Sequence, residues 1–351
     1  MKTRTLLLTV GSALILSACG GGGGGGGSTG NGGAVGTTPS NPNTPLPPVS
    51  TLSTITAANA VAVASNAYAA TASISDSSSL TDVLTGVSIQ PVNNGLVPTV
   101  FKLVRHAFDG PNLLTGVVQT KGCTSGGTIA IDANLKNPEM LGNGDVMTMT
   151  ATNCVENGAT LNGTLKVTFS NVTGDVLNSS TWTATLDSVF TDLAVTSTTN
   201  NVTSVVSVGG DMKIAMNQEN ASRNTVTITG SSLQTTAKQN GTVLTTRTLA
   251  DYSLNGTTRD GVVTTGGANF KLSGNTTSLG QFSFTSQNTA AFVNAVGKNA
   301  NSGAMLVNGN ASSVTLTAIN DSSVRVDFSA KGDGVVTQSF TLSWAEFLAK
   351  I

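Results

Sequence analysis

The three cysteines are the residues in this 351-residue sequence with the clearest capacity for chemistry. Cys123 and Cys154 form an even pair once Cys19, near the start of the chain, is set aside. Two thiols are too few to hold a metal ion, and the single histidine, His106, lies outside the segment between them. In an oxidising compartment such a pair indicates a disulfide. It would close a loop of about 30 residues and stabilise the fold by roughly 3 to 4 kcal/mol in the chain-entropy model.

Side chains suited to catalysis are scarce. Serine–histidine and cysteine–histidine sites would both have to use His106, which falls on the polar side of a predicted helix and is expected to face solvent. The 18 acidic residues are spread along the chain without a cluster that suggests paired carboxylates. We therefore predict a protein that is not an enzyme, with no catalytic residues, no metal and no cofactor.

Oxygen-bearing side chains are dense between Cys123 and Cys154. Asp132, Asn134, Asn143 and Asp145 are of the types that ligate calcium. Their spacing is not that of an EF-hand, and a lysine and a proline interrupt the run. We interpret the segment as a long hairpin loop closed at its base by the disulfide, and keep a calcium site as the alternative.

The first residues of the chain have the pattern of an export signal. Lys2 and Arg4 are followed by a mostly apolar run over residues 6–16, shorter than the roughly 20 residues that span a bilayer. The run ends in Leu16-Ser17-Ala18-Cys19, which resembles the lipobox of bacterial lipoproteins. The resemblance implies cleavage before Cys19, a diacylglyceryl group on its thiol and a further acyl chain, such as palmitate, on its new amine. Two or three acyl chains anchor a protein stably, at roughly 0.8 kcal/mol per buried methylene.

The residues after Cys19 bear on location and partners. Gly20 in second place favours the outer membrane, by resemblance to enterobacterial sorting, on its periplasmic face or at the cell surface. Residues 19–50 are a glycine tract followed by Pro-, Thr- and Asn-rich sequence, which predicts a flexible tether. Loss of Lys2 and Arg4 leaves 15 basic and 18 acidic residues, a net charge of 15 − 18 = −3. This balance, without a basic patch, argues against nucleic acid as a partner.

Three segments after the tether have helical spacing. They are the Ala-rich residues 54–72, the short run 79–84, and residues 98–107, which begin with Pro98 at a favoured first helical position. We assign residues 1–18 to a signal peptide, 19–50 to the tether, 51–110 to a helical segment and 111–351 to an antiparallel β domain.

From residue 111 onward, apolar and polar residues alternate. Leu165, Val167 and Phe169 point one way, for example, and Thr164 and Lys166 point the other. About twelve such runs follow, the last of them Phe340, Leu342 and Trp344, and Asn-Gly or Asp-Gly pairs at positions 240, 255, 260, 308 and 333 are predicted turns between them.

Strands of this number with one apolar face cannot lie in a flat open sheet. We predict a mainly β fold: a large antiparallel meander curled into a barrel-like or two-layer sheet, with two or three N-terminal helices packed against it. A membrane-spanning barrel is the less favoured alternative, because 4% aromatic residues are few for two aromatic girdles.

Two further stretches resemble known proteins. Residues 123–163, with Cys123-x-x-Gly126-Gly127-Thr128, Asn153-Cys154 and Leu161-Asn162-Gly163, are similar to a segment of uncharacterised proteobacterial lipoproteins, which implies no activity. The cysteine followed by polyglycine resembles the tether of neisserial surface lipoproteins, such as the factor H-binding and transferrin-binding families. That resemblance implies a β-barrel body, surface display and binding of host proteins.

These features together predict a lipid-anchored envelope lipoprotein with a non-enzymatic binding or structural role. Its expected partners are the membrane, through the lipid on Cys19, and an apolar ligand or an envelope or host protein. The alternative is a surface-displayed adhesin or host-factor-binding lipoprotein.

Overall fold

The structure is a computed structural model that describes residues 51–75, 104, 107, 115–156 and 158–351. All of these belong to one unit of the chain, Pro48–Ile351. The predicted signal peptide and tether, and most of the predicted helical segments 79–84 and 98–107, lie outside the described residues. Val104 and Ala107 are the described members of the latter segment, and both are helical and buried.

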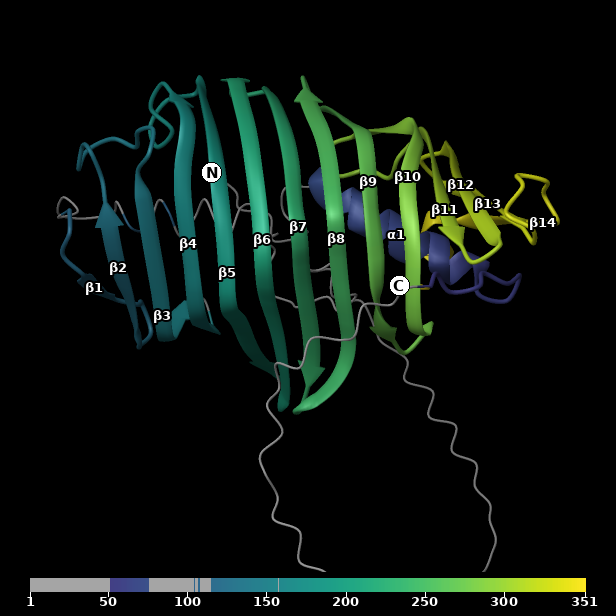
Figure 1. The fold of residues 1–351 in the computed structure, drawn as a ribbon, viewed down its shortest axis with the longest axis horizontal. Helices are drawn as coiled ribbons and strands as arrows, with labels where there is room; N and C mark the ends of the chain where they lie inside the picture. Colours follow the sequence, from purple (N-terminus) through teal and green to yellow (C-terminus); the bar gives the residue numbers. More distant parts are fainter. Residues whose placement is uncertain (1–50, 76–103, 105–106, 108–114, 157) are drawn as a thin grey trace, which may run out of the picture. The chain divides into compact units, whose positions relative to one another are not determined.

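The described chain is dominated by a single antiparallel sheet in which each strand pairs with the next one along the sequence (Figure 1). One helix precedes the strands and a short one follows them. The elements are α1 (Ala60–Ser75), β1 (Gln119–Gly122), β2 (Thr128–Asn134), β3 (Val146–Glu156), β4 (Ala159–Thr173), β5 (Trp182–Thr199), β6 (Val202–Asn220), β7 (Arg223–Gln239), β8 (Thr242–Arg259), β9 (Val262–Thr276), β10 (Gly280–Ala295), β11 (Ser302–Gly309), β12 (Ser312–Asn320), β13 (Ser323–Ser329), β14 (Gln338–Ser343) and α4 (Trp344–Leu348).

The alternation in the sequence decides which face of the sheet is buried. Leu165, Val167 and Phe169 of β4 are fully buried, as the period of two predicts, while the alternating residues Thr164 and Lys166 lie on the opposite face. The same alternation holds along most of the strands, and the buried side chains form one continuous hydrophobic core. The predicted mainly β, antiparallel meander is confirmed.

A row of β-bulges crosses the sheet and bends its strands. The pairing shifts register between Ala151 and Cys154, between Phe190 and Leu193, and between Ala250 and Ser253. Each shift lets one strand bend and twist more strongly than a regular ladder allows. The sheet can therefore curl over its apolar face without breaking the pairing on either side of the row.

Two glycines allow neighbouring strands to approach closely at these bulges. A Cβ on Gly163 would lie 2.2 Å from the carbonyl oxygen of Asp192, and one on Gly210 would lie 2.0 Å from that of Ser232. Both glycines also have positive φ angles, 104° and 114°. Any larger residue would force the two backbones apart.

Helix α1 packs on the apolar face of the sheet and reaches strands on both sides of β10. It contacts β8 and β9, and also β11, β12 and β13. Figure 1 shows it behind β8–β10 in that view. Tyr68 of α1 lies at the centre of an aromatic cluster, with ring centroids 5.1 Å from Phe292, 4.9 Å from Trp344 and 6.0 Å from Phe347. The sheet therefore bends around α1, and α4 closes the C-terminal side of the same core.

The residues just before α1 join strands that are distant in the sequence. The Ser53 N–H donates to the Ser283 carbonyl, and the Asn310 N–H donates to the Ser53 carbonyl. The Ile55 N–H donates to Oγ of Ser312, with the Ile55 side chain fully buried. The N-terminal part of the described chain is thus fixed to β10 and to the turn between β11 and β12.

Several details differ from the sequence-based prediction. Within the described residues the sheet has fourteen strands, and it is not closed, since β1 and β14 each pair with one neighbour. Among the described residues α1 is the one N-terminal helix, so the prediction of two or three is not met there, and the C-terminal helix α4 was not predicted. Trp344 opens α4 instead of ending a strand, because Ser343 and Glu346 form a capping box at that point.

Asn255-Gly256 lies within β8 and makes no turn. The Asn255 side chain accepts a hydrogen bond from the Gly267 N–H at 2.7 Å, so the pair braces a register shift between β8 and β9. The turn predicted at Asn308-Gly309 falls two residues later, at Asn310-Ala311, whereas Asn240-Gly241 and Asp260-Gly261 form the predicted turns. Within the described part of the chain, no helix has both the length and the apolar character needed to cross a membrane.

Candidate functional site

The predicted lipidation site, Cys19, lies outside the described residues, as does His106. The disulfide predicted between Cys123 and Cys154 is present, with an S–S distance of 2.01 Å and the two Cα atoms 5.4 Å apart. It joins the residue after β1 to the C-terminal part of β3. The bond ties the first strands of the sheet together at a place where β1 is only four residues long.

Glu156 lies beside the disulfide. Its carboxylate accepts hydrogen bonds from the Thr124 N–H at 2.8 Å and from the Thr124 hydroxyl at 2.6 Å. Cys123, Cys154 and Glu156 are the one group of three metal-ligating residue types found close together in the described chain. Because both sulfurs are used in the disulfide, only the carboxylate could serve as a ligand, and the group acts as a brace for the turn between β1 and β2.

The segment considered for calcium forms the connection between β2 and β3. Asp145 is fully buried, and its carboxylate accepts the Lys136 N–H at 3.0 Å and the Gly142 N–H at 2.7 Å. The Lys136 ammonium donates to the Asn143 carbonyl at 2.6 Å. Here the Asp145 carboxylate satisfies backbone donors inside its own loop.

The other three calcium candidates are placed differently. Asn143 reaches across to β4, where its side chain accepts the Val172 N–H at 2.7 Å. Asp132 and Asn134 lie on β2 with exposed side chains. The loop thus uses Asn143 and Asp145 as structural hydrogen-bonding residues.

A buried cation on the apolar face was not among the predicted site residues. Arg247 of β8 is 3% exposed, and its Nη2 donates to Oδ1 of Asn66 in α1 at 2.6 Å. Burial lowers the pKa of Arg247 to about 10, so the guanidinium stays charged at neutral pH. The sequence could have indicated this burial. Arg247 and Leu249 are two residues apart on one strand, so their side chains lie on the same face, and Leu249 is buried.

Asn66 connects this cation to the end of the chain. Its Nδ2 donates to the Ala62 carbonyl within α1 at 2.8 Å and to the Lys350 carbonyl at 3.5 Å, and the hydroxyl of the preceding residue, Ser65, donates to the Phe347 carbonyl at 2.8 Å. These bonds fix α1 to β8 on one side and to α4 on the other. The arrangement orients the helix on the sheet.

A second polar cluster on the sheet centres on Asp211 of β6. Burial opposes ionisation of its carboxylate, but hydrogen bonds from Ser231 and from the Ser232 N–H outweigh it and lower the pKa. The neighbouring Tyr252 hydroxyl donates to the Asp211 carbonyl at 2.6 Å, and burial raises the pKa of that phenol. The cluster braces the register shift between β6 and β7.

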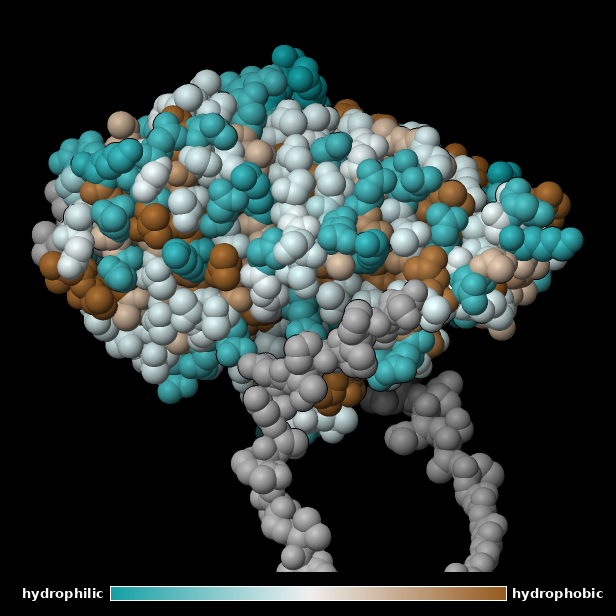
Figure 2. Space-filling view, in the orientation of Figure 1, coloured by the Kyte–Doolittle hydropathy of each residue, from teal (hydrophilic) through white to brown (hydrophobic). Residues whose placement is uncertain are grey.

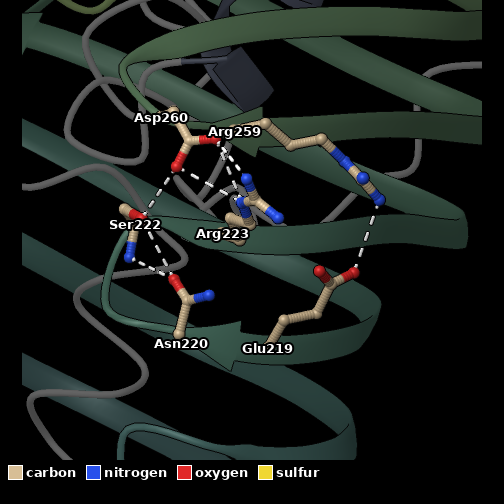
Figure 3. A network of polar contacts seen from close by, with 6 residues as sticks. All are labelled: Glu219, Asn220, Ser222, Arg223, Arg259 and Asp260. Carbon is tan, nitrogen blue, oxygen red and sulfur yellow. Dashed lines mark hydrogen bonds and ion pairs between the residues drawn. The ribbon is translucent and has the colours of Figure 1, made fainter.

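A third cluster joins two hairpin tips, β6–β7 and β8–β9 (Figure 3). The Arg223 guanidinium donates to the Asp260 carboxylate, with Nη2 2.6 Å from Oδ2, and Arg259 lies 3.4 Å from Glu219. The hydrogen bond from Arg223 lowers the pKa of Asp260. Both ion pairs are exposed. Because two cations face two carboxylates, the cluster has no net charge to attract a charged ligand.

In these three clusters polar groups are bonded to one another between α1 and β8, across a bulge, and between two hairpin tips. In the second cluster the Ser231 hydroxyl contacts the Asp211 carboxylate, which also accepts the N–H groups of Ser231 and Ser232. Comparison with protein-family models, curated proteins and solved structures finds no match for this chain.

Proposed function

We propose that this chain is a lipid-anchored envelope lipoprotein whose β body has a non-enzymatic binding or structural role. The observation that carries the proposal is the motif Leu16-Ser17-Ala18-Cys19 after a short apolar run. The disulfide between Cys123 and Cys154 supports it, because such bonds persist in oxidising compartments outside the cytosol. Residues 19–50 would then act as the tether between the lipid and the body.

The packing beneath α1 bears on the kind of partner. Tyr68, Trp344 and Phe347 are buried against one another, and the apolar face around them is part of one continuous core. Side chains of the protein itself thus occupy this part of the sheet. This favours a partner at the outside of the body over an apolar ligand under the helix.

The composition of the outward face of the sheet also indicates the kind of partner. Figure 2 shows residues of intermediate hydropathy over most of the visible face, with hydrophilic and hydrophobic residues scattered among them. Threonine pairs lie across neighbouring strands there, such as Thr150 with Thr164 and Thr173 with Thr183, at oxygen–oxygen distances of 3.1 and 2.7 Å. Such a surface suits contact with another protein through hydrogen bonds.

A Cys19→Ser variant tests the anchor. The variant should leave the membrane fraction and become either soluble or signal-retained, because no thioether to a lipid can form. A matched Ser17→Ala variant keeps small residues before the cysteine and should stay with the membrane as the parent chain does. If processed Cys19→Ser chain still partitions with membranes, the anchor is wrong.

The alternative function is a surface-displayed adhesin or host-factor-binding lipoprotein, which the polyglycine tether favours by resemblance. Protease treatment of intact cells separates the two. Digestion of the β body would support surface display, and survival of the body on intact cells, with digestion after lysis, would place it on the periplasmic face.

A further inference from the structure

The last strand of the sheet, β14, has a neighbour on one side. It pairs with β13, with Val326 opposite Phe340 and Val324 opposite Leu342. The Trp344 N–H donates to the Ser322 carbonyl at 3.2 Å, which fixes the alternation of the ladder. Every second residue of β14, counted from Trp344, therefore directs its backbone groups toward β13.

Ser339 and Thr341 have the opposite parity. Their N–H and C=O groups point away from β13, at the free edge of the sheet. Both residues are exposed, and no described residue pairs with this side of the strand. Two donors and two acceptors are thus presented in a row, spaced as in a regular antiparallel ladder.

The other edge of the sheet is covered at β1, whereas no described strand pairs with the free side of β14. At β1, Lys121 donates its ammonium to the Ala107 carbonyl at 2.7 Å, so a charged side chain and another segment lie at that edge. Strand β14 has the sequence Gln-Ser-Phe-Thr-Leu-Ser, without charge or proline. Natural proteins commonly block exposed edges with lysine, proline or a covering segment, because bare edges pair with other chains.

We propose that β14 is a pairing site for β14 of a second copy of this chain, with a twofold axis at Phe340. In this register Ser339 of one protomer faces Thr341 of its partner, and Thr341 faces Ser339. All outward backbone groups of the two residues are then satisfied, through four hydrogen bonds. The outward backbone groups lie one residue before and one residue after Phe340. Because they are symmetric about Phe340, the arrangement is self-complementary.

The side chains fit the same arrangement. Phe340 is half-buried on the core face of the sheet, and at the axis it would meet its own copy in a non-hydrogen-bonded pair, where aromatic side chains stabilise a sheet. Val335 and Val336, just before β14 in the sequence, are 68% and 52% exposed. An uncharged strand meets no like-charge repulsion from its copy.

A six-residue strand pair gives a small interface, so the dimer should be weak in dilute solution. Anchoring both copies to one membrane would raise their effective concentration and favour the pair. This last step rests on the proposed lipid anchor, whereas the pairing itself does not.

Cysteine cross-linking of the full chain tests the register. In a Phe340→Cys variant the two new cysteines would have Cα atoms about 4.5 Å apart across the axis, within the range that a disulfide spans. A Leu342→Cys variant is the matched control. Its residue lies on the same face, but the two copies would be about 14 Å apart, at 3.4 Å per residue over four residues. Mild oxidation followed by non-reducing gels and intact mass gives the readout.

We expect a covalent dimer of twice the chain mass from Phe340→Cys and none from Leu342→Cys. Equal dimer from both variants would mean random collision, no dimer from either would mean no pairing, and a cross-link of another mass would mean a different protein on this edge. Each of these three results overturns the proposal. The same two variants can also be made in a Cys19→Ser chain and oxidised at high protein concentration. This version of the test does not depend on the lipid anchor.

Backbone blocking gives an independent measurement. Thr341→Pro removes an outward N–H without touching the bonds to β13, so it should abolish the dimer in native mass spectra of membrane-extracted protein. Thr341→Ala keeps that N–H and should retain the dimer. If Thr341→Pro dimerises as well as Thr341→Ala while both remain folded, pairing through this edge is excluded.

Discussion

The two ends of the sheet are held together by different means. At the β1–β3 end, residues near one another in the sequence are joined by the disulfide and by the short-range bonds of Asp145. At the β12–β14 end, Tyr68 of α1 packs on Trp344 and Phe347, which lie more than half the chain away in the sequence. A local covalent bond thus serves one end, and long-range apolar packing serves the other.

The difference follows from what each end can bury. Strand β1 has four residues of alternating intermediate and exposed character and contributes little apolar area. A disulfide stabilises such a region chiefly by restricting the unfolded chain. The C-terminal end brings together four aromatic rings and two helices, and burial of apolar area stabilises it directly. The comparison predicts that damage at one end should leave the other largely intact.

The largest expected effect is at the C-terminal end. Trp344→Ala would remove a fully buried ring from the aromatic cluster and the hydrogen bond from its Nε1 to the Asn320 carbonyl. We expect a loss of about 3–5 kcal/mol in the free energy of unfolding, the usual range for a buried tryptophan or phenylalanine cut to alanine. Urea denaturation measures it, with the exposed Thr341→Ala as a control expected to change stability by less than about 0.5 kcal/mol. A loss below about 1 kcal/mol for Trp344→Ala would show that the cluster does not hold this end.

The next effect is at the opposite end. A double Cys123→Ser, Cys154→Ser variant should lose roughly 3 to 4 kcal/mol, the chain-entropy value for a loop of about 30 residues. Hydrogen exchange should become faster in β1–β3 and stay unchanged in α1 and β12–β14, because strands β4–β11 separate the two ends of the sheet. Labelling of the denatured, unreduced parent chain should find no free thiol at either position. Faster exchange along the whole sheet would contradict the independence of the two ends.

The sequence predicts one of these two ends far better than the other. The disulfide, the loop between β2 and β3 and the buried face of β4 all follow from residues that are close in the sequence. The aromatic cluster depends on α1 meeting α4, and nothing in the local pattern of either segment specifies the other. Trp344 shows the limit: its period-two spacing from Leu342 predicted a strand, and the capping box of Ser343 and Glu346 decided for a helix.

The polar clusters show the same division. Parity along β8 is enough to place Arg247 on the buried face, although its partner Asn66 is 181 residues away and could not have been found that way. The bulge at Asp192 brings its backbone so close to β4 that only a glycine fits at Gly163. The sequence around a glycine in a Thr-rich strand does not indicate which strand lies against it. Sequence patterns thus specify faces and turns, whereas the pairing of distant elements is decided by the packing of the whole sheet.

The smallest expected effect concerns the loop between β2 and β3, at the β1–β3 end of the sheet. Asp145→Ala leaves the N–H groups of Lys136 and Gly142 without their buried acceptor, which should cost about 1–3 kcal/mol of unfolding free energy. Asp132→Ala, on the exposed side of β2, is the matched control and should be close to neutral. Thermal melts of both variants with and without added calcium separate the two interpretations of this loop. If Asp145 is a structural acceptor, calcium leaves the parent melting temperature unchanged; a rise that disappears in both variants would instead assign the loop to a calcium ion, because a ligand that binds only the folded state raises the melting temperature.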